Sequence, residues 1–159
     1  MSGYLAPLSI CVAGALLEGI CAGAGVKDYL RNLKWPSYSP PLWAWYVIAA
    51  VYYAVVFVCA YRILQRPASV PFRNIAFALV LSVVVMNAVW NLLFFRAKDL
   101  AATFFFSICY SVVVVGLWYC LSRFDRVAPA AIGFYGLYLI YANVWGYRLW
   151  RINIQEKRS

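Results

Sequence analysis

Five long runs of apolar residues alternate along the chain with short segments that carry most of the charge. The runs cover residues 5–26, 42–61, 75–95, 100–121 and 128–150. Each is close to the ~20 residues that a helix needs to cross the apolar core of a bilayer. None shows the alternation of apolar and polar residues that a membrane β-barrel requires. The pattern therefore predicts an all-α integral membrane protein, a compact bundle of five transmembrane helices forming one domain over residues 1–159.

The composition supports this interpretation. Hydrophobic residues make up 66% of the chain and charged residues only 12%, whereas soluble domains contain about 25% charged residues. The first run lacks a preceding basic segment and is too long for the apolar part of a signal peptide, so we expect it to be retained as a helix. Although the net charge is +9, most of the 14 Lys and Arg residues lie between or just beyond the apolar runs. They indicate contact with a lipid bilayer and no nucleic-acid partner.

The basic residues are shared unevenly between the two ends of the predicted bundle. The end with the N-terminus has five of them, in the second and fourth loops, and the other end has nine, in the first loop, the third loop and the C-terminal tail. Because basic residues are enriched on the cytoplasmic side, this distribution predicts a cytoplasmic C-terminus and an N-terminus outside.

The longest segment between the apolar runs, residues 27–41, reads KDYLRNLKWPSYSPP. Its three prolines stiffen the backbone, and its aromatic residues make it amphipathic. Long loops in compact proteins are often lids or binding segments, but aromatic rings also favour the membrane interface. The segment is therefore either a lid over a site or an interfacial anchor.

The first helix carries an acidic residue, Glu18, at a depth where a charge is costly. No Lys or Arg lies well inside another apolar run to pair with it. Glu18 is therefore either a proton-linked or ligand-contacting group, or a protonated or hydrogen-bonded acid that faces the bundle interior. The small residues Ala15, Gly19 and Gly23 are spaced by four, which lets a second helix approach closely, within one bundle or between two copies.

Polar and aromatic residues share one face of the third helix. Asn87, Trp90, Asn91 and Phe94 stand at positions i, i+3, i+4 and i+7. Amides in a membrane need partners, either on another helix or on a ligand. The face predicts either a hydrogen-bonded helix contact or one wall of a binding site.

The fifth helix has an aromatic stripe that suits an opposite wall. Tyr135, Tyr138, Ala142 and Trp145 fall at i, i+3, i+7 and i+10. Flat aromatic walls with a few amides favour a large, planar, mostly apolar ligand, although such a stripe is also typical of simple packing.

The sequence offers little for a metal site or an enzyme active site. It contains no His, and its five cysteines lie in predicted helices without a CxxC pair. It also has no carboxylate pair or nucleophile–base arrangement. We expect no metal, no required cofactor and no enzymatic activity.

The order of these elements resembles the translocator protein family, also called tryptophan-rich sensory proteins (TspO/MBR, peripheral benzodiazepine receptor-like). The segment Asn87-x-x-Trp90-x-x-x-Phe94-Phe95 follows a proline-rich loop, PSYSPPLW, and precedes a last helix that ends YRLWRIN. The resemblance covers nearly the whole chain. It implies a five-helix bundle, usually a homodimer, that binds tetrapyrroles such as protoporphyrin and haem, and in some members sterols, in a cavity under the first loop.

Carried over by position, the resemblance assigns ligand-binding residues to the first loop and to three helices. They are Tyr38, Pro40, Pro41, Ala49, Tyr53, Asn87, Trp90, Asn91, Phe94, Tyr135, Tyr138 and Ala142. The last helix also contains a sterol-recognition pattern, Val144-x-x-Tyr147-x-x-x-Arg151, of a kind that is common by chance.

The chain departs from the family pattern at several aromatic positions. The family usually has tryptophan where this chain has Tyr29, Tyr38, Ala49 and Tyr138. Light-dependent porphyrin breakdown, credited to some members, depends on tryptophans of the second and fifth helices, so the resemblance favours a binding protein over an enzyme here. The alternatives are a small transporter, or an assembly or regulatory subunit without tetrapyrrole affinity.

Overall fold

The computed structural model describes residues 2–156. Its elements are a short 3₁₀ helix η1 (Ser2–Tyr4), α1 (Leu5–Ala22), α2 (Val26–Asn32), α3 (Leu42–Leu64), α4 (Arg73–Asn91), a π-helical turn η2 (Leu92–Arg96), α5 (Leu100–Ser122) and α6 (Val127–Glu156). No strand occurs in this range. Five helical segments, α1, α3, α4 with η2, α5 and α6, are long and apolar enough to cross a membrane. The predicted all-α membrane fold is confirmed.

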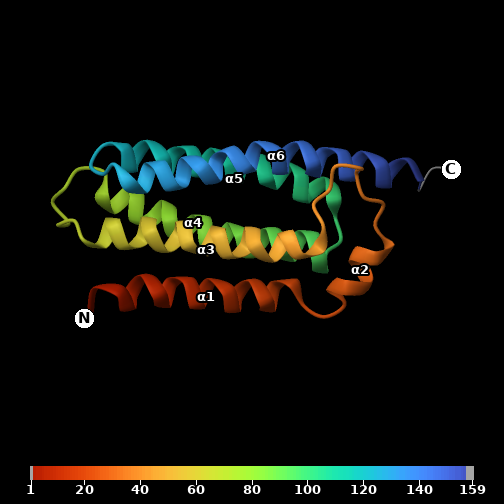
Figure 1. Ribbon diagram of the computed structural model, residues 1–159, viewed down its shortest axis with the longest axis horizontal. Coiled ribbons are helices and arrows are strands. Elements are labelled where there is room, and N and C mark those ends of the chain that lie inside the picture. The colour runs from red at the N-terminus through yellow and green to blue at the C-terminus, as the bar shows by residue number, and fades with distance from the viewer. Residues whose placement is uncertain (1, 157–159) are drawn as a thin grey trace.

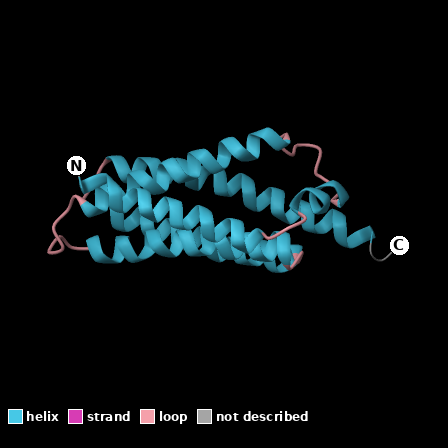
Figure 2. Cartoon of the chain, turned by 90° about the horizontal axis from the view of Figure 1, so that it is seen from below, coloured by secondary structure: helices cyan, strands magenta, loops and turns pink. Residues whose placement is uncertain are grey.

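The long helices run side by side along the long axis of the molecule (Figure 1). α5 packs on both α4 and α6, and α3 packs on α1, α4 and α6. α1 lies along the edge of the bundle, against α3, α4 and η2. The N-terminus lies at one end, whereas α2, the loop after it and the C-terminal end of α6 lie at the other (Figures 1 and 2).

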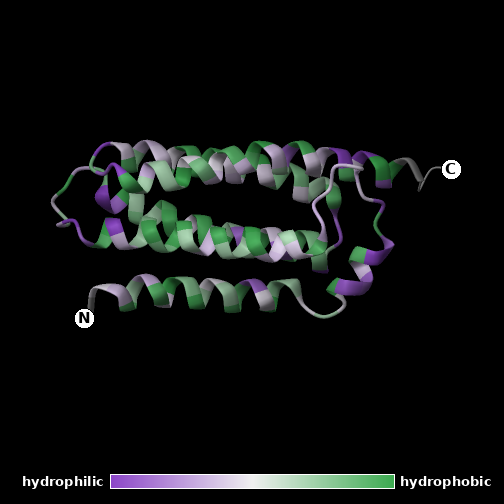
Figure 3. Ribbon diagram, in the orientation of Figure 1, coloured by the Kyte–Doolittle hydropathy of each residue, from purple (hydrophilic) through white to green (hydrophobic). Residues whose placement is uncertain are grey.

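Hydrophilic residues concentrate at the two ends of the bundle, and the helices between these ends are mostly hydrophobic (Figure 3). Leu16, Ile20, Val112 and Leu137 are each more than 60% exposed. Helices that are apolar on all sides are typical of membrane spans. These side chains therefore face lipid, while the polar ends lie at headgroup level.

The chain leaves the first helix earlier than predicted. We expected a helix over 5–26 and an irregular loop over 27–41, but α1 ends at Ala22 and α2 occupies Val26–Asn32. Gly23 and Gly25 have φ angles of 68° and 84°, a conformation that glycine adopts without strain and that ends the helix. The helix-forming sequence that follows then starts a second, short helix.

The other helices also differ from the predicted limits. α3 continues to Leu64 and α6 to Glu156, past the predicted ends at 61 and 150. The third span, predicted over 75–95, begins at Arg73, and its last turn, η2, is a π-helix in which the N–H of Ala97 donates to the carbonyl of Leu92 at 2.8 Å. Apolar length alone cannot show such a turn, because it changes the hydrogen bonding and not the composition.

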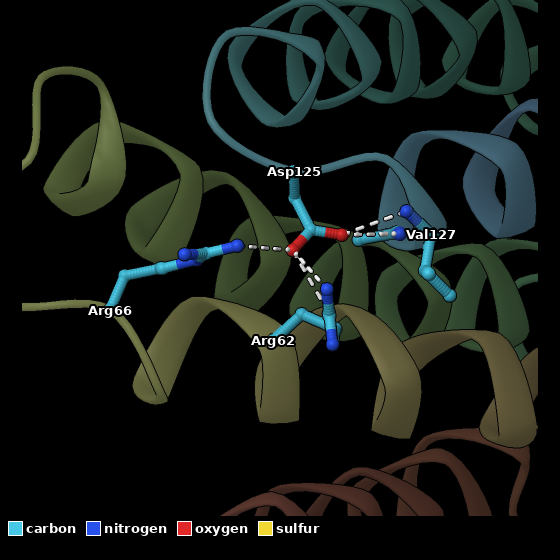
Figure 4. A network of polar contacts seen from close by, with 5 residues as sticks. Arg62, Arg66, Asp125 and Val127 are labelled. Atoms are coloured by element: carbon cyan, nitrogen blue, oxygen red, sulfur yellow. Dashed lines mark hydrogen bonds and ion pairs between the residues drawn. The ribbon is translucent and has the colours of Figure 1, made fainter.

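Asp125, at the end of the bundle away from α2, joins α3 to α6 through a network of polar contacts (Figure 4). Its side chain is fully buried; Oδ2 accepts from Arg62 Nε at 2.9 Å and from Arg66 at 3.3 Å, while Oδ1 accepts the backbone N–H groups of Val127 and Ala128. Burial acts to raise the pKa of Asp125, but hydrogen bonds from Arg62, from those two N–H groups and from Arg66 outweigh it and bring the pKa to about 2. The ionised carboxylate therefore caps α6 and binds it to the end of α3.

Candidate ligand-binding cavity

A cavity of about 1050 Å³ lies inside the bundle, beneath α2 and the loop that follows it. All five spanning segments contribute to its walls. Ligand sites commonly occupy ~300–1,000 Å³, so this cavity is large enough for a bulky ligand.

α2 and residues 33–41, together called the lid, are fastened to α6. The side chain of Asn153 accepts the N–H of Lys34 at 3.2 Å and donates to the carbonyl of Lys34 at 3.0 Å. The indole N–H of Trp145 donates to the Ser39 hydroxyl at 2.9 Å. The predicted role of this segment as a plain interfacial anchor does not account for these bonds, which hold it across the mouth of the cavity.

Tyr29 attaches the other part of the lid to η2. Its ring meets Phe94 edge-on with centroids 5.7 Å apart, and the ammonium of Lys98 lies 5.5 Å from the ring centroid. Burial, and next the charge of Asp99, raise the pKa of Tyr29. The hydroxyl therefore stays neutral, and the ring acts as an apolar surface.

Aromatic rings form the part of the cavity next to the lid. Trp145 is 3% exposed and lies 4.9 Å from Trp45 and 5.9 Å from Trp35, centroid to centroid. The rings of Trp90 and Phe94 stack at 4.8 Å with an interplanar angle of 11°. All five residues line the cavity. They present flat apolar faces to its contents.

The inner part of the cavity is more polar. The hydroxyls of Tyr110 and Tyr135, both buried, are 3.1 Å apart, and the buried hydroxyl of Tyr52 has no hydrogen-bond partner among residues 2–156. The amide of Asn87 donates to Oε1 of Glu18 at 2.6 Å. A molecule that reached this depth would therefore meet hydroxyl, amide and carboxyl groups.

A second amide closes the wall between α5 and α6. Ser107 donates to Asn143 Oδ1 at 2.7 Å, and Asn143 Nδ2 donates to the Ser111 hydroxyl at 2.9 Å. Bonds of this kind hold neighbouring helices together in a membrane. Because Ser107 and Asn143 also line the cavity, they add polar edges to an otherwise aromatic wall.

Charge is distributed unequally along the cavity. Lys27 and Arg31 of the lid line its mouth, whereas Glu18 lies inside. The mouth therefore attracts anionic groups, and the interior does not.

The structure brings most of the sequence-predicted site residues together around this one cavity. Its lining includes Glu18, Pro40, Pro41, Ala49, Asn87, Trp90, Asn91, Phe94, Tyr135, Tyr138 and Ala142.

Two predicted residues do not line the cavity. Tyr38 lies on the outer side of the lid, 45% exposed, with its carbonyl accepting the hydroxyl of Tyr141. Tyr53 lies beside the cavity, where α1 meets α3: its carbonyl accepts from the Cys11 thiol, and its ring is next to Gly14. In both cases helix and lid packing turn the ring away from the cavity, which the sequence pattern does not reveal.

The sterol-recognition pattern also lies outside the cavity. Val144, Tyr147 and Arg151 are all exposed on α6, and the Tyr147 ring packs against Phe104 and Trp150. The pattern therefore belongs to the lipid-facing surface of the bundle.

Sequence reasoning missed several lining residues. Asn143 is an amide inside an apolar run and was detectable by the argument that singled out Asn87. Trp45, Tyr52 and Tyr110 gave no such signal, because their helices are apolar on every side and the inward face has no distinct composition.

Comparison with known families bears on the whole chain. The family model described as TspO/MBR family matches residues 7–151. No individual curated protein matches the chain.

Proposed function

The chain belongs to the TspO/MBR family, and from this premise we propose that it binds flat amphiphiles, tetrapyrroles such as protoporphyrin and haem or else sterols, in the cavity beneath the lid. The observation that carries the proposal is the cavity itself, about 1050 Å³ walled by aromatic rings under a fastened lid. Flat aromatic walls stack on a planar ligand and exclude water from it.

The arrangement of charge suits such a ligand. The apolar ring system of a tetrapyrrole would lie between the stacked pair Trp90–Phe94 and the indoles of Trp45 and Trp145. Its carboxylates would point to the mouth, where charged groups of the lid can pair with them. Binding, with carriage or sensing of the bound molecule, is the role we propose.

We propose binding and not catalysis. The wall position Ala49 has no indole to exchange electrons with an excited porphyrin, and Glu18 is the only carboxyl group among the described residues that line the cavity. Acid–base or nucleophilic chemistry needs paired groups.

We also propose that the protein forms a homodimer, as the family resemblance implies. On α1, Gly14 faces the bundle, whereas Gly19 has open space around it and Ala15 is exposed. This outer face is free to pack on a helix of a second copy. Co-purification of two differently tagged copies from a mixed membrane tests the association.

A dark titration with protoporphyrin tests the proposed binding. The purified protein in detergent is titrated while the porphyrin absorbance band is followed, and we expect saturable one-site binding. Ala142→Trp places an indole in the cavity and should weaken affinity about tenfold or more, a loss of ~1.4 kcal/mol per tenfold. Asn87→Ala should weaken it by a smaller factor, since it removes one amide.

Matched variants outside the cavity control for general damage. Ala130→Trp changes an exposed position of the same helix α6, and Asn74→Ala an exposed position of α4; both should bind like the wild type. The proposal is wrong if binding is not saturable, or if Ala142→Trp folds and binds as tightly as Ala130→Trp.

A further inference from the structure

We propose that Glu18 makes the inner part of the cavity an acidic subsite, which takes the protonated amine of a flat amphiphile. The proposal rests on the proposed function, since it concerns the same cavity, and it adds flat amines as a further class of ligand beside tetrapyrroles and sterols.

The carboxyl group of Glu18 lies inside the cavity. Glu18 lines the cavity, and its Oε1 accepts from Asn87 at 2.6 Å. Asn87 stands nine residues before Arg96, where η2 ends near the lid, which at 1.5 Å per residue is about 13 Å. The carboxyl group therefore lies below the lid, within the spanning part of the bundle.

Glu18 has no cationic side chain beside it among the described residues. In the part of the chain that the structure describes, no Lys or Arg lies within ion-pair distance of Glu18. The basic residues that line the cavity, Lys27 and Arg31, belong to the lid at its mouth. An acid within a membrane span is costly when no cation pairs with it. A cationic ligand group would supply the positive charge that no described side chain provides beside Glu18.

The inner part of the cavity also offers a hydroxyl group that lacks a hydrogen-bond partner. Tyr52 lines the cavity and is only 4% exposed, and its hydroxyl has no hydrogen-bond partner among residues 2–156. Buried hydroxyls are nearly always paired. An ammonium group has three N–H donors, which can serve the Glu18 carboxylate and the hydroxyl oxygen of Tyr52, and tyrosine rings also attract cations.

The charge at the mouth then fixes the orientation of the ligand. A molecule with an amine at one end and an acidic or neutral group at the other would enter amine first, with its far end beside Lys27 and Arg31. The cavity would reject the reverse orientation, because it places an anion against Glu18.

Three probes with the same ring system test this selectivity. We would compare 1-pyrenemethylamine, protonated at pH 7, with neutral 1-pyrenemethanol and anionic 1-pyrenecarboxylate, using energy transfer from tryptophan to pyrene in a nonionic detergent. The wild type should bind the amine about tenfold or more tightly than the alcohol, as a charge-assisted hydrogen bond provides, and the carboxylate most weakly.

Glu18→Gln keeps the size of the side chain and removes its charge, so the ratio of amine to alcohol affinity should fall to about one. Asp28→Asn is the matched control, because Asp28 lies in the lid with its side chain 81% exposed; it should leave the ratio unchanged. If thermal unfolding shows that Glu18→Gln does not fold, Tyr52→Phe serves instead and should lower the ratio several-fold.

The outcomes separate this inference from the proposed function. Equal affinity of the wild type for amine and alcohol overturns the subsite, as does a ratio that survives Glu18→Gln. Failure of all three pyrenes to bind, with saturable protoporphyrin binding, also overturns the subsite but leaves the proposed function standing. Failure of both probe families rejects both.

Discussion

The carboxylate of Asp125 is fully buried, yet every group that contacts its oxygens is a hydrogen-bond donor. Arg62 and Arg66 keep more than a third of their side chains exposed, so they pair with the acid without being fully desolvated themselves. A buried charge that loses its partners is strongly destabilising. This one side chain therefore fixes the relation of α3 to α6 at the end of the bundle away from the lid.

We predict that Asp125→Asn destabilises the protein by roughly 2 kcal/mol at pH 6, because asparagine still caps α6 but carries no charge. The folded-state pKa of about 2 is below the ordinary value of about 3.9. The charge therefore stabilises the fold above about pH 4, and this contribution is lost as the pH falls towards 2. Thermal unfolding in detergent should show a difference between wild type and variant that shrinks between pH 5 and pH 2.

The exposed acid Asp28 provides the comparison, and Asp28→Asn should have little effect at any pH. A difference between Asp125→Asn and wild type that is the same at pH 6 and pH 2.5 would show that the lost interaction is not the ionised carboxylate.

At the scale of the element, α1 depends on one close approach to its neighbours. A Cβ atom on Gly14 would lie 2.6 Å from Cγ1 of Val84, whereas one on Gly19 would meet no atom within 4 Å. Val84 is buried and β-branched, so its side chain has little freedom to move. The position of α1 against α4 therefore relies on the absence of a side chain at Gly14.

We predict opposite effects of the same substitution at these two glycines. Gly14→Ala should lower the free energy of unfolding by about 1–3 kcal/mol through overpacking. Gly19→Ala should leave stability unchanged or raise it by up to about 1 kcal/mol, since alanine favours the helix. Thermal unfolding in detergent of the two single variants decides the matter, and equal shifts would contradict the packing described for α1.

The sequence predicts some features of these helices well and leaves others open. The five spans are readable because lipid forces a long apolar helix, and Asn87 and Glu18 are readable because polar groups at that depth stand out. The sequence does not show which aromatic side chains face the cavity, because lipid and protein core are both apolar. This is why the residue pattern does not single out Tyr52, and why Tyr53 was assigned to the cavity only through the family resemblance. The residues that fasten the lid, such as Asn153, depend on contacts between segments far apart in the chain.

At the scale of the whole molecule, five spans place the two termini at opposite ends (Figure 1). The lid end carries more basic residues along the sequence than the end held by Asp125. By the positive-inside rule we propose that the lid, the cavity mouth and the C-terminus face the cytoplasm.

Reporter fusions at each terminus, expressed in bacteria, test this predicted orientation. Green fluorescent protein at the C-terminus should fluoresce and alkaline phosphatase there should be inactive, because the fluorescent protein matures in the cytoplasm and the phosphatase folds to its active form outside it. The N-terminal fusions should behave in the opposite way. The reverse pattern would place the cavity mouth outside and reject the proposed orientation.

The hydrogen bonds between Asn153 and Lys34 also affect how fast a molecule can leave the cavity. The lid connects α1 to α3 along the chain, yet it is hydrogen-bonded to α6. A molecule that leaves through the mouth therefore has to wait until these hydrogen bonds break. We therefore expect opening of the lid to limit the dissociation rate, the quantity in which most affinity differences between related complexes appear. On this expectation, the strength of the attachment between the lid and α6 sets the residence time of a bound molecule.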